Sequence, residues 1–199
     1  NAWQYTWLVP QDLDLLVERF GGVESTLERL DGLFTADTKM EGEDVTPDIS
    51  GLIGQYVHGN EPSHHIIYFY TMLGEPWKAA DRLYEVMATM YSTEPDGLSG
   101  NEDVGQMSAW YVMTTLGFYP VEPASGKYVL GVPMVDGAEI DVEGGIFRVE
   151  RAGYSEANRY VQSVELNGVA LDRNYITHEE VIAGGLLKFN MGAEKSVWY

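Results

Sequence analysis

The sequence predicts an α+β protein, with a helical part over residues 1–120 and a small antiparallel β-sandwich over residues 121–199. Up to Pro120, apolar side chains recur every three or four residues, which is the period of an amphipathic helix. After Pro120 the segments are short, alternate apolar with polar side chains and are separated by turns such as Gly144-Gly145 and Asn167-Gly168. We therefore expect two domains that meet at Pro120.

The composition is that of a globular chain with a strong negative charge. Asp and Glu number 31 against 12 Lys and Arg, so the formal net charge is -19. This charge disfavours phosphate backbones and anionic membranes, so we expect neither a nucleic acid nor a membrane partner. It suits neutral substrates and hard divalent cations with oxygen ligands. The absence of cysteine excludes disulfides, thiolate metal sites and a cysteine nucleophile.

Two amphipathic helices are expected near the N-terminus. The first covers residues 10–20, with Gly21-Gly22 as its stop signal, and the second covers residues 23–34. The acidic stretch 35–50 contains Gly and Pro and is interpreted as a loop, to which we assign no site.

Two further helices follow. Residues 62–73 are apolar almost all round after Pro62, which predicts an interior helix. Residues 76–90 carry an apolar stripe at helical spacing that is typical of a core-facing helix. A loop with turn residues over 92–100 then leads into the most informative stretch of the chain.

That stretch runs from Gly97 to Gly117. A glycine-rich loop brings an amide and two carboxylates together at Asn101, Glu102 and Asp103, and a helix is expected from there to the glycine stop. At or just before a helix N-terminus, the macrodipole favours an ionised Asp103 that can accept a proton. The alternative is that these carboxylates only cap the helix.

A second stretch repeats the Gly-Asn-Glu order at Gly59-Asn60-Glu61, again before a helix start. Two such loops are hard to explain as caps alone. If the helices ring an axis, loops at one end converge, so we expect Glu61 and Asp103 to border one cavity. The neighbouring His64 and His65 point to different faces of a helix, and a histidine in this position is more often a packing residue than a ligand.

The first ten residues contain Trp3 and Trp7 with polar neighbours, a combination on which sugar rings stack, although a tryptophan is more often a core residue. Convergent carboxylates and aromatic platforms, without a basic patch or a nucleotide-binding glycine motif, indicate carbohydrate hydrolysis. An inverting glycosidase needs a protonated acid and an ionised base that activates water. We expect Asp103 to be the base.

Three ordered motifs then carry a family resemblance. They are residues 1–7 (NAWQYTW), 58–65 (HGNEPSHH) and 100–111 (GNEDVGQMSAWY), the last followed by LGFYP at 116–120. Together they resemble glycoside hydrolase family 92, the calcium-dependent exo-acting α-mannosidases. The match spans essentially the whole chain.

The resemblance implies that residues 1–120 are part of an (α/α)6 toroid, that the substrate is an α-mannose-containing glycan and that hydrolysis inverts the anomeric centre. Family members often have Asp-Glu-Asp where this chain has Asn101, Glu102 and Asp103. Because an amide cannot act as a base, Asp103 takes that role and Asn101 orients water or substrate. The linkage that is cut stays open.

The resemblance also implies a substrate subsite and a Ca²⁺ ion. It assigns Glu61, Trp3 and His64 to the sugar, and Asn60, Glu61 and Gln4 to the metal. The general acid is expected just before Asn1, so the parent chain N-terminal to Asn1 is the expected partner and these 199 residues alone are expected to be inactive. The expected location is periplasmic or secreted, in a bacterium.

Three alternatives remain at this point. The same oxygens and tryptophans fit a non-catalytic calcium-dependent mannose-binding module. A different toroidal enzyme, such as a phosphorylase or a lyase, is disfavoured because the loops lack an Arg or Lys cluster for phosphate. The chain also fits a purely structural fragment.

Overall fold

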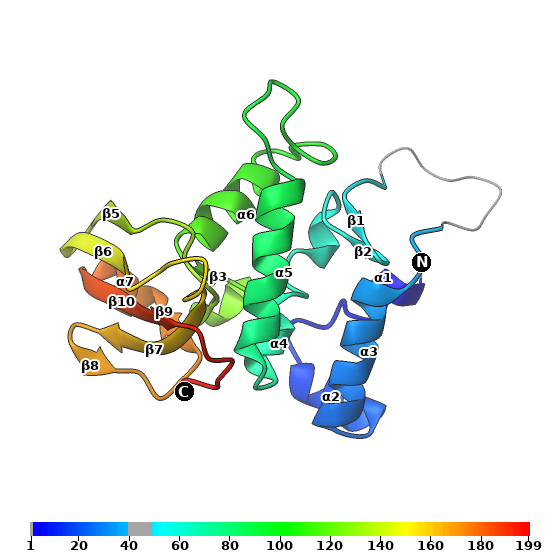
Figure 1. The fold of residues 1–199 in the computed structure, drawn as a ribbon, viewed down its shortest axis with the longest axis horizontal. Helices are drawn as coiled ribbons and strands as arrows, with labels where there is room; N and C mark the ends of the chain where they lie inside the picture. The colour runs from blue at the N-terminus through cyan, green and yellow to red at the C-terminus, as the bar shows by residue number, and fades with distance from the viewer. Residues whose placement is uncertain (1, 40–48) are drawn as a thin grey trace. The chain divides into compact units, whose positions relative to one another are not determined.

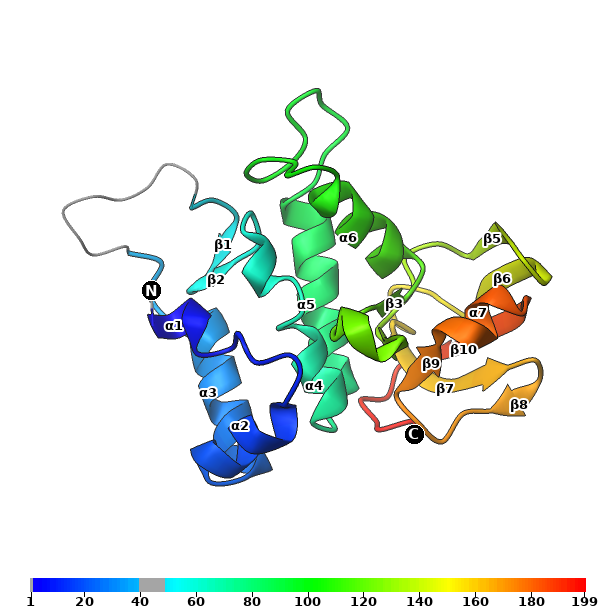
Figure 2. The same ribbon diagram turned by 180° about the vertical axis from the view of Figure 1, so that it is seen from behind.

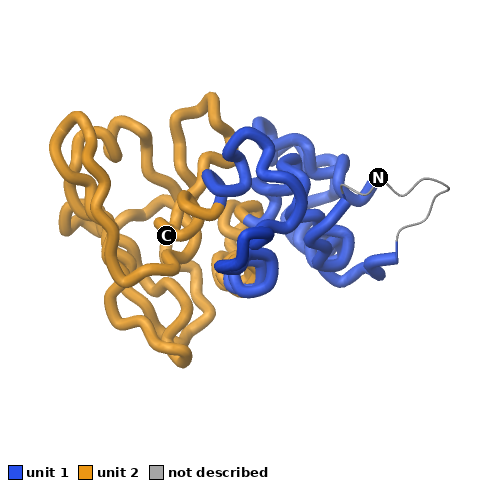
Figure 3. The backbone as a smooth tube through the Cα atoms, turned by 90° about the horizontal axis from the view of Figure 1, so that it is seen from above, with its two compact units in different colours: residues 1–67, 84–110 blue, residues 68–83, 111–199 orange. Residues whose placement is uncertain are grey.

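A computed structural model describes residues 2–39 and 49–199, so most of the predicted acidic loop lies outside the described residues. The chain forms two compact units (Figure 3), one of residues 1–67 and 84–110 and one of residues 68–83 and 111–199. This division differs from the expected domain boundary at Pro120, which stays a prediction.

The first unit opens with three helices, α1 (Ala2–Tyr5), α2 (Leu13–Phe20) and α3 (Val23–Thr35) (Figure 1). The Asp12 side chain caps α2 by accepting a hydrogen bond from the backbone N–H of Leu15. Gly21 ends the helix with a left-handed φ of 88°. The helices predicted over 10–20 and 23–34 are confirmed.

A tight hairpin and a 3-10 turn follow, formed by β1 (Leu52–Ile53), β2 (Tyr56–Val57) and η1 (Glu61–Ser63). The single helix predicted over 62–73 is wrong, because α-helical geometry begins only at α4 (Tyr68–Met72). One reason is a long-range contact: the His64 carbonyl accepts a hydrogen bond from the Trp110 indole at 3.0 Å instead of continuing a helical ladder.

Two longer helices flank the second polar loop, α5 (Pro76–Thr89) and α6 (Gln106–Thr115). The prediction for α5 is confirmed. The start of α6 is later than predicted, because residues 103–105 all have left-handed φ values of 50°, 59° and 93° and cannot belong to the helix. Gly117 has the predicted left-handed conformation after the helix, with a φ of 88°.

The second unit contains two sheets (Figures 1 and 2). One has the order β3-β4-β9 and the other the order β5-β6-β10-β7-β8. Helix α7 lies against β6, and a 3-10 turn, η2, precedes β4. The elements are β3 (Phe118–Tyr119), η2 (Pro123–Ser125), β4 (Lys127–Leu130), β5 (Gly137–Val142), β6 (Gly145–Ala152), β7 (Tyr160–Leu166), β8 (Val169–Ala170), β9 (Tyr175–Thr177), α7 (His178–Ile182) and β10 (Gly185–Gly192).

The purely antiparallel arrangement predicted for these strands is wrong at one pair. β10 is antiparallel to β7 but parallel to β6, since the chain reaches β10 through the intervening α7 rather than through a hairpin. The buried Phe118 of the smaller sheet contacts Phe147 of the larger sheet edge-on, with ring centroids 6.4 Å apart. The mixed α+β class is confirmed, whereas the toroid and the sandwich stay predictions.

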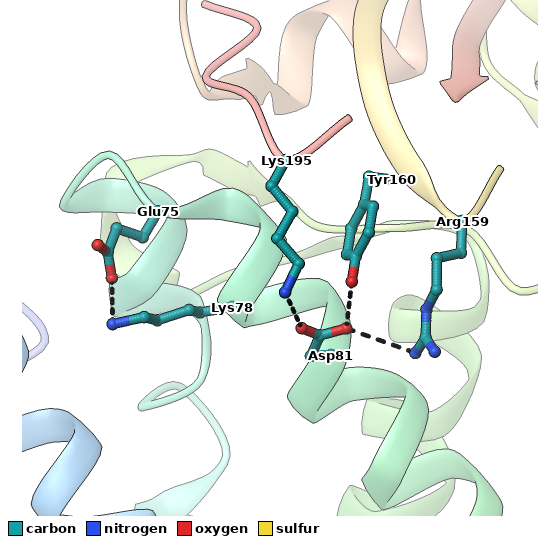
Figure 4. A network of polar contacts seen from close by, with 6 residues as sticks. All are labelled: Glu75, Lys78, Asp81, Arg159, Tyr160 and Lys195. Atoms are coloured by element: carbon teal, nitrogen blue, oxygen red, sulfur yellow. Dashed lines mark hydrogen bonds and ion pairs between the residues drawn. The ribbon is translucent and has the colours of Figure 1, made fainter. Parts of the chain in front are cut away.

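A polar network on α5 fastens two later segments of the second unit (Figure 4). The Asp81 carboxylate accepts a hydrogen bond from Tyr160 at 3.0 Å and pairs with Lys195 at 3.4 Å and Arg159 at 3.6 Å. Partly exposed ion pairs of this kind contribute little to stability individually. We therefore interpret the network as fixing where β7 and the C-terminal segment lie on α5. In the described part of the chain, no helix has the length and apolarity needed to cross a membrane.

Candidate active site

The two Gly-Asn-Glu loops meet at their glycines, within the first unit. A β-carbon on Gly100 would lie 2.7 Å from the Gly59 carbonyl oxygen. A β-carbon on Gly59 would lie 2.5 Å from Ser50 Oγ and 2.9 Å from the Ser99 carbonyl oxygen. Only glycine allows the two backbones to approach this closely.

This contact makes Gly59 a sensitive position. Gly59→Ala is expected to lower the free energy of unfolding by about 1–3 kcal/mol, the usual cost of forcing a methyl group into a filled site. Because Gly59 does not have a left-handed φ, the effect is purely steric. Thermal unfolding followed by circular dichroism measures it.

Gly32→Ala is the matched control. Gly32 lies inside α3, and a β-carbon at this position would have Trp3 Cζ3 as its nearest neighbour, at 3.8 Å. We expect this variant to be unchanged or slightly more stable, because alanine favours helix over glycine by roughly 0.5–1 kcal/mol. Equal melting temperatures for the two variants would contradict the close packing of the loops.

The contact between the loops brings Glu61 and Asp103 close together, within reach of a hydrogen bond when one of the two carboxyl groups is protonated. Burial raises the pKa of Glu61, and the hydrogen bond with Asp103 and the charge of Asp103 raise it further. Glu61 Oε1 is buried and has no hydrogen-bond partner within the described residues. The pair can therefore hold a proton between two carboxyl groups or present oxygens to a cation.

Glu102 takes the capping role for which both carboxylates of this loop are suited. Its Oε1 accepts a hydrogen bond from the backbone N–H of Ser108 at 2.9 Å. Hydrogen bonds from the Ser108 side chain and backbone lower the pKa of Glu102. Asp103 instead lies in the turn that precedes α6, three residues before Gln106, so the helix N-terminus is occupied by its neighbour.

The turn that carries Asp103 is strained. Asp103 and Val104 have φ values of 50° and 59°, and Val104 is fully exposed, at 108%. A β-branched residue in this conformation is an outlier that costs on the order of 1–3 kcal/mol, and such costs often occur at functional sites. Asn101 and Asp103 are both exposed, as residues that meet a substrate must be.

His64 lies behind the carboxylates, 1% exposed. Its Nε2–H donates to the His58 carbonyl oxygen at 2.9 Å, and its Nδ1 accepts a hydrogen bond from the Gln106 amide at 3.1 Å. Burial lowers the pKa of His64 to about 4, so the ring is neutral. His65 is also buried and is bonded to the Trp7 carbonyl oxygen at 2.8 Å. Contact between His64 and a sugar stays a prediction.

The N-terminal segment lies beside the Glu61 loop, since α1 packs against η1 and β2. Gln4 is buried, and its amide donates to the Gln55 carbonyl oxygen at 3.4 Å. Trp3 is 47% exposed and lines a cavity of about 490 Å³ together with Trp7 and Arg29. The residues that line this cavity do not include Glu61 or Asp103, so a sugar platform at Trp3 stays a prediction.

Sequence reasoning missed two residues of this site. Ser50 has a buried Oγ without a hydrogen-bond partner among the described residues, beside Gly59, and no motif marks it. Gln106 belongs to the third motif but has no predicted role, although it bonds to His64. Its distance of three residues from Asp103 was the available signal.

In the described residues, acidic and histidine side chains alone do not form a complete metal site. Over residues 2–39 and 49–199, no group of three or more His, Asp or Glu residues is placed to hold a metal ion. Glu61 and Asp103 provide two carboxylates, and any further ligand would be an amide, a carbonyl or a sugar oxygen, all of which suit calcium.

Comparison with known proteins identifies the family of the chain. The family model of the glycosyl hydrolase family 92 catalytic domain matches residues 1–193. An uncharacterized secreted glycosidase of Arthroderma benhamiae is 28% identical over the whole chain, which covers 24% of that protein.

Two solved structures of Bacteroides thetaiotaomicron proteins are similar over nearly the whole chain. A family GH92 α-mannosidase in complex with mannoimidazole has a TM-score of 0.87 and 39% identity, covering 96% of this chain and 25% of that one. A family GH92 inverting mannosidase has a TM-score of 0.81 and 35% identity, covering 98% and 27%. The chain therefore spans about a quarter of the length of these relatives. Because the family model matches residues 1–193, almost the full length of this chain, the chain belongs to glycosyl hydrolase family 92.

Proposed function

We propose that the protein containing these residues is an inverting exo-acting α-mannosidase that hydrolyses α-mannosides of glycans. The observation that carries the proposal is the proximity of Glu61 and Asp103, which brings two polar loops, 42 residues apart in the sequence, into one site. Membership of family 92 and the similarity to two mannosidases support the sugar. The family and the carboxylate contact together favour hydrolysis over a purely structural role.

In this proposal Asp103 is the general base. Its carboxylate takes a proton from the water that attacks the anomeric carbon, on the face opposite the leaving oxygen. Asn101, two residues earlier in the same exposed loop, orients that water or the substrate. The general acid that protonates the leaving oxygen comes from a carboxyl group outside these 199 residues, so the chain alone does not complete the reaction.

Glu61 binds the sugar and a calcium ion, with Asn60 and Gln4 as further metal ligands. The buried, unbonded Oε1 of Glu61 supports a cation here, because a hard divalent ion would satisfy an oxygen that no described side chain does. Held by these residues, the ion would supply Lewis-acidic coordination to the hydroxyl groups of the sugar. Trp3 completes the subsite in this proposal as a stacking surface, while His64, buried and hydrogen-bonded at both ring nitrogens, supports it from behind.

The substrate and location follow from the same evidence. The net charge of -19 fits a neutral glycan better than a polyanion. One relative is described as a secreted glycosidase, and we propose that this protein also acts outside the cytoplasm, on exported or extracellular glycans.

Calcium removal tests the proposed cofactor. The whole protein is expected to lose hydrolysis of an aryl or disaccharide α-mannoside in the presence of a calcium chelator and to regain it when calcium is restored. The 199-residue chain alone is expected to be inactive under both conditions. Released mannose, measured with anomer-resolved NMR, reports both the rate and inversion.

Two outcomes would count against the proposal. Chelator-resistant hydrolysis by the whole protein would show that calcium is not required. Activity of the isolated chain would show that the general acid lies within these 199 residues. Strict dependence on inorganic phosphate would indicate a phosphorylase instead.

A further inference from the structure

His64 connects the two polar loops through hydrogen bonds that no sugar contact requires. The Gln106 amide donates to His64 Nδ1 at 3.1 Å, and the Trp110 indole donates to the His64 carbonyl oxygen at 3.0 Å. Gln106 and Trp110 both lie on α6, the helix that follows Asp103. His64 follows Glu61 by three residues, and Gln106 follows Asp103 by three.

The direction of these bonds is determined by chemistry. His64 Nε2 faces the His58 carbonyl oxygen, which can only accept, so Nε2 carries the proton and Nδ1 is left as an acceptor for Gln106. The side chain is 1% exposed, and burial keeps the ring neutral, which preserves that acceptor. A neutral, fully bonded histidine is suited to holding two segments in register.

His58 provides a second link to α6. Its Nδ1 is bonded to the Tyr56 hydroxyl at 2.9 Å and its Nε2 to the Tyr91 hydroxyl at 2.7 Å, and the Tyr91 hydroxyl donates to the Met107 carbonyl oxygen at 3.3 Å. The His58 ring also packs edge-on against Trp110, with centroids 4.3 Å apart. The chain is therefore attached to α6 on both sides of Glu61, through His58 before it and His64 after it.

We propose that His64 and Gln106 are positioning residues that fix the separation of Glu61 and Asp103. This inference rests on the proposed function, because the separation matters only if both carboxylates act on one sugar. Neither residue needs to touch substrate. Their link sets where the Glu61 loop lies relative to the turn that carries Asp103, and a displacement of about 1 Å between reacting groups can cost roughly 100-fold in rate.

The main test is Gln106→Met in the whole protein, with Ala109→Met as the control. Methionine has a similar length and helix propensity but no N–H for His64 Nδ1, while Ala109 is exposed on the same helix. We expect Gln106→Met to lower kcat by roughly tenfold or more with little change in KM, and Ala109→Met to change neither. A structural role alone would lower the melting temperature and leave kcat per folded molecule unchanged.

The partner residue provides a rescue. His64→Asn keeps an acceptor oxygen close to the position of Nδ1, whereas His64→Leu removes it. We expect His64→Asn to retain more of the wild-type kcat than His64→Leu, and Gln106→Met to have little additional effect in the His64→Leu background. A raised KM for His64→Asn with a normal kcat in Gln106→Met would instead mean that His64 contacts the sugar.

A second measurement is independent of activity. Spin labels on non-canonical side chains at the exposed positions Pro62 and Val104 report the distance between the loops by electron–electron double resonance. We expect a narrow distribution that broadens in Gln106→Met and not in Ala109→Met. If the wild type hydrolyses no mannoside but the distribution broadens, the proposed function fails and the positioning role stands. An unchanged distribution together with an unchanged kcat would overturn the positioning role.

Discussion

Asp103→Asn is expected to reduce kcat for α-mannoside hydrolysis by about 10³-fold in the whole protein, within the 10²- to 10⁴-fold range typical of general base catalysis. The amide has nearly the same shape as the carboxylate and can still hydrogen-bond to Glu61, but it cannot accept a proton from water. Initial rates with an aryl α-mannoside, over a range of concentrations, separate kcat from KM. We expect KM to change much less than kcat.

Asp96→Asn is the matched control, since Asp96 is an exposed acid in the same unit and outside both polar loops. It should have wild-type kinetics. Mannose binding by Asp103→Asn, measured by calorimetry, should persist. A near-wild-type kcat in Asp103→Asn would show that Asp103 is not the general base. If the wild type binds mannose without turnover, the protein is a binding module.

The strained turn explains how Asp103 can be both exposed and held in place. Glu102 satisfies the N-terminus of α6, so Asp103 does not have to cap the helix. The left-handed conformation of Asp103 and Val104 keeps the carboxylate outside the helix and next to Glu61. The cost of that conformation is offset by packing elsewhere, including the glycine contact between Gly59 and Gly100.

Local periodicity predicted most of the fold. The apolar spacing identified α2, α3 and α5, although α2 begins three residues later than predicted, and the alternating pattern predicted the short strands after Pro120. The errors occur where long-range contacts decide the structure. Trp110 takes the His64 carbonyl that a helix over 62–73 would have used, and the parallel pairing of β10 with β6 leaves no signal in either strand.

The same limit applies to the site. The repeated Gly-Asn-Glu order identified two loops that lie close to each other, whereas a cavity bordered by both Glu61 and Asp103 stays a prediction. Which carboxylate caps α6 was not predictable, because Glu102 and Asp103 are both suitable capping residues and only the left-handed turn separates them. The role of Gln106 was not assigned from the sequence, because its hydrogen-bond partner, His64, lies 42 residues away in the chain.

Glu61→Gln is expected to be more stable and nearly inactive. Glu61 is held beside Asp103 with a buried oxygen that has no partner in the described part of the chain, so its negative charge opposes folding at neutral pH. A glutamine can donate a hydrogen bond to Asp103 and carries no charge. Without calcium, we expect the melting temperature of the 199-residue chain to rise by about 2–4 °C, the effect of roughly 1 kcal/mol at this size. Because the proposed calcium and sugar ligand is lost, kcat/KM should fall by at least about 100-fold.

The pH dependence distinguishes this explanation from a general gain in packing. Since the pKa of Glu61 is raised in the folded state above its ordinary value of 4.5, the folded protein binds this proton more tightly than the unfolded chain. The penalty is therefore complete above the raised pKa and disappears as the pH falls to about 4.5. The stability advantage of Glu61→Gln over the wild type should be largest at neutral pH and should disappear on acidification. The control Glu94→Gln, at an exposed acid in the same unit, should have no stability advantage at any pH in this range. An advantage that stayed constant across that range would show that the charge of Glu61, buried beside Asp103, is not its source.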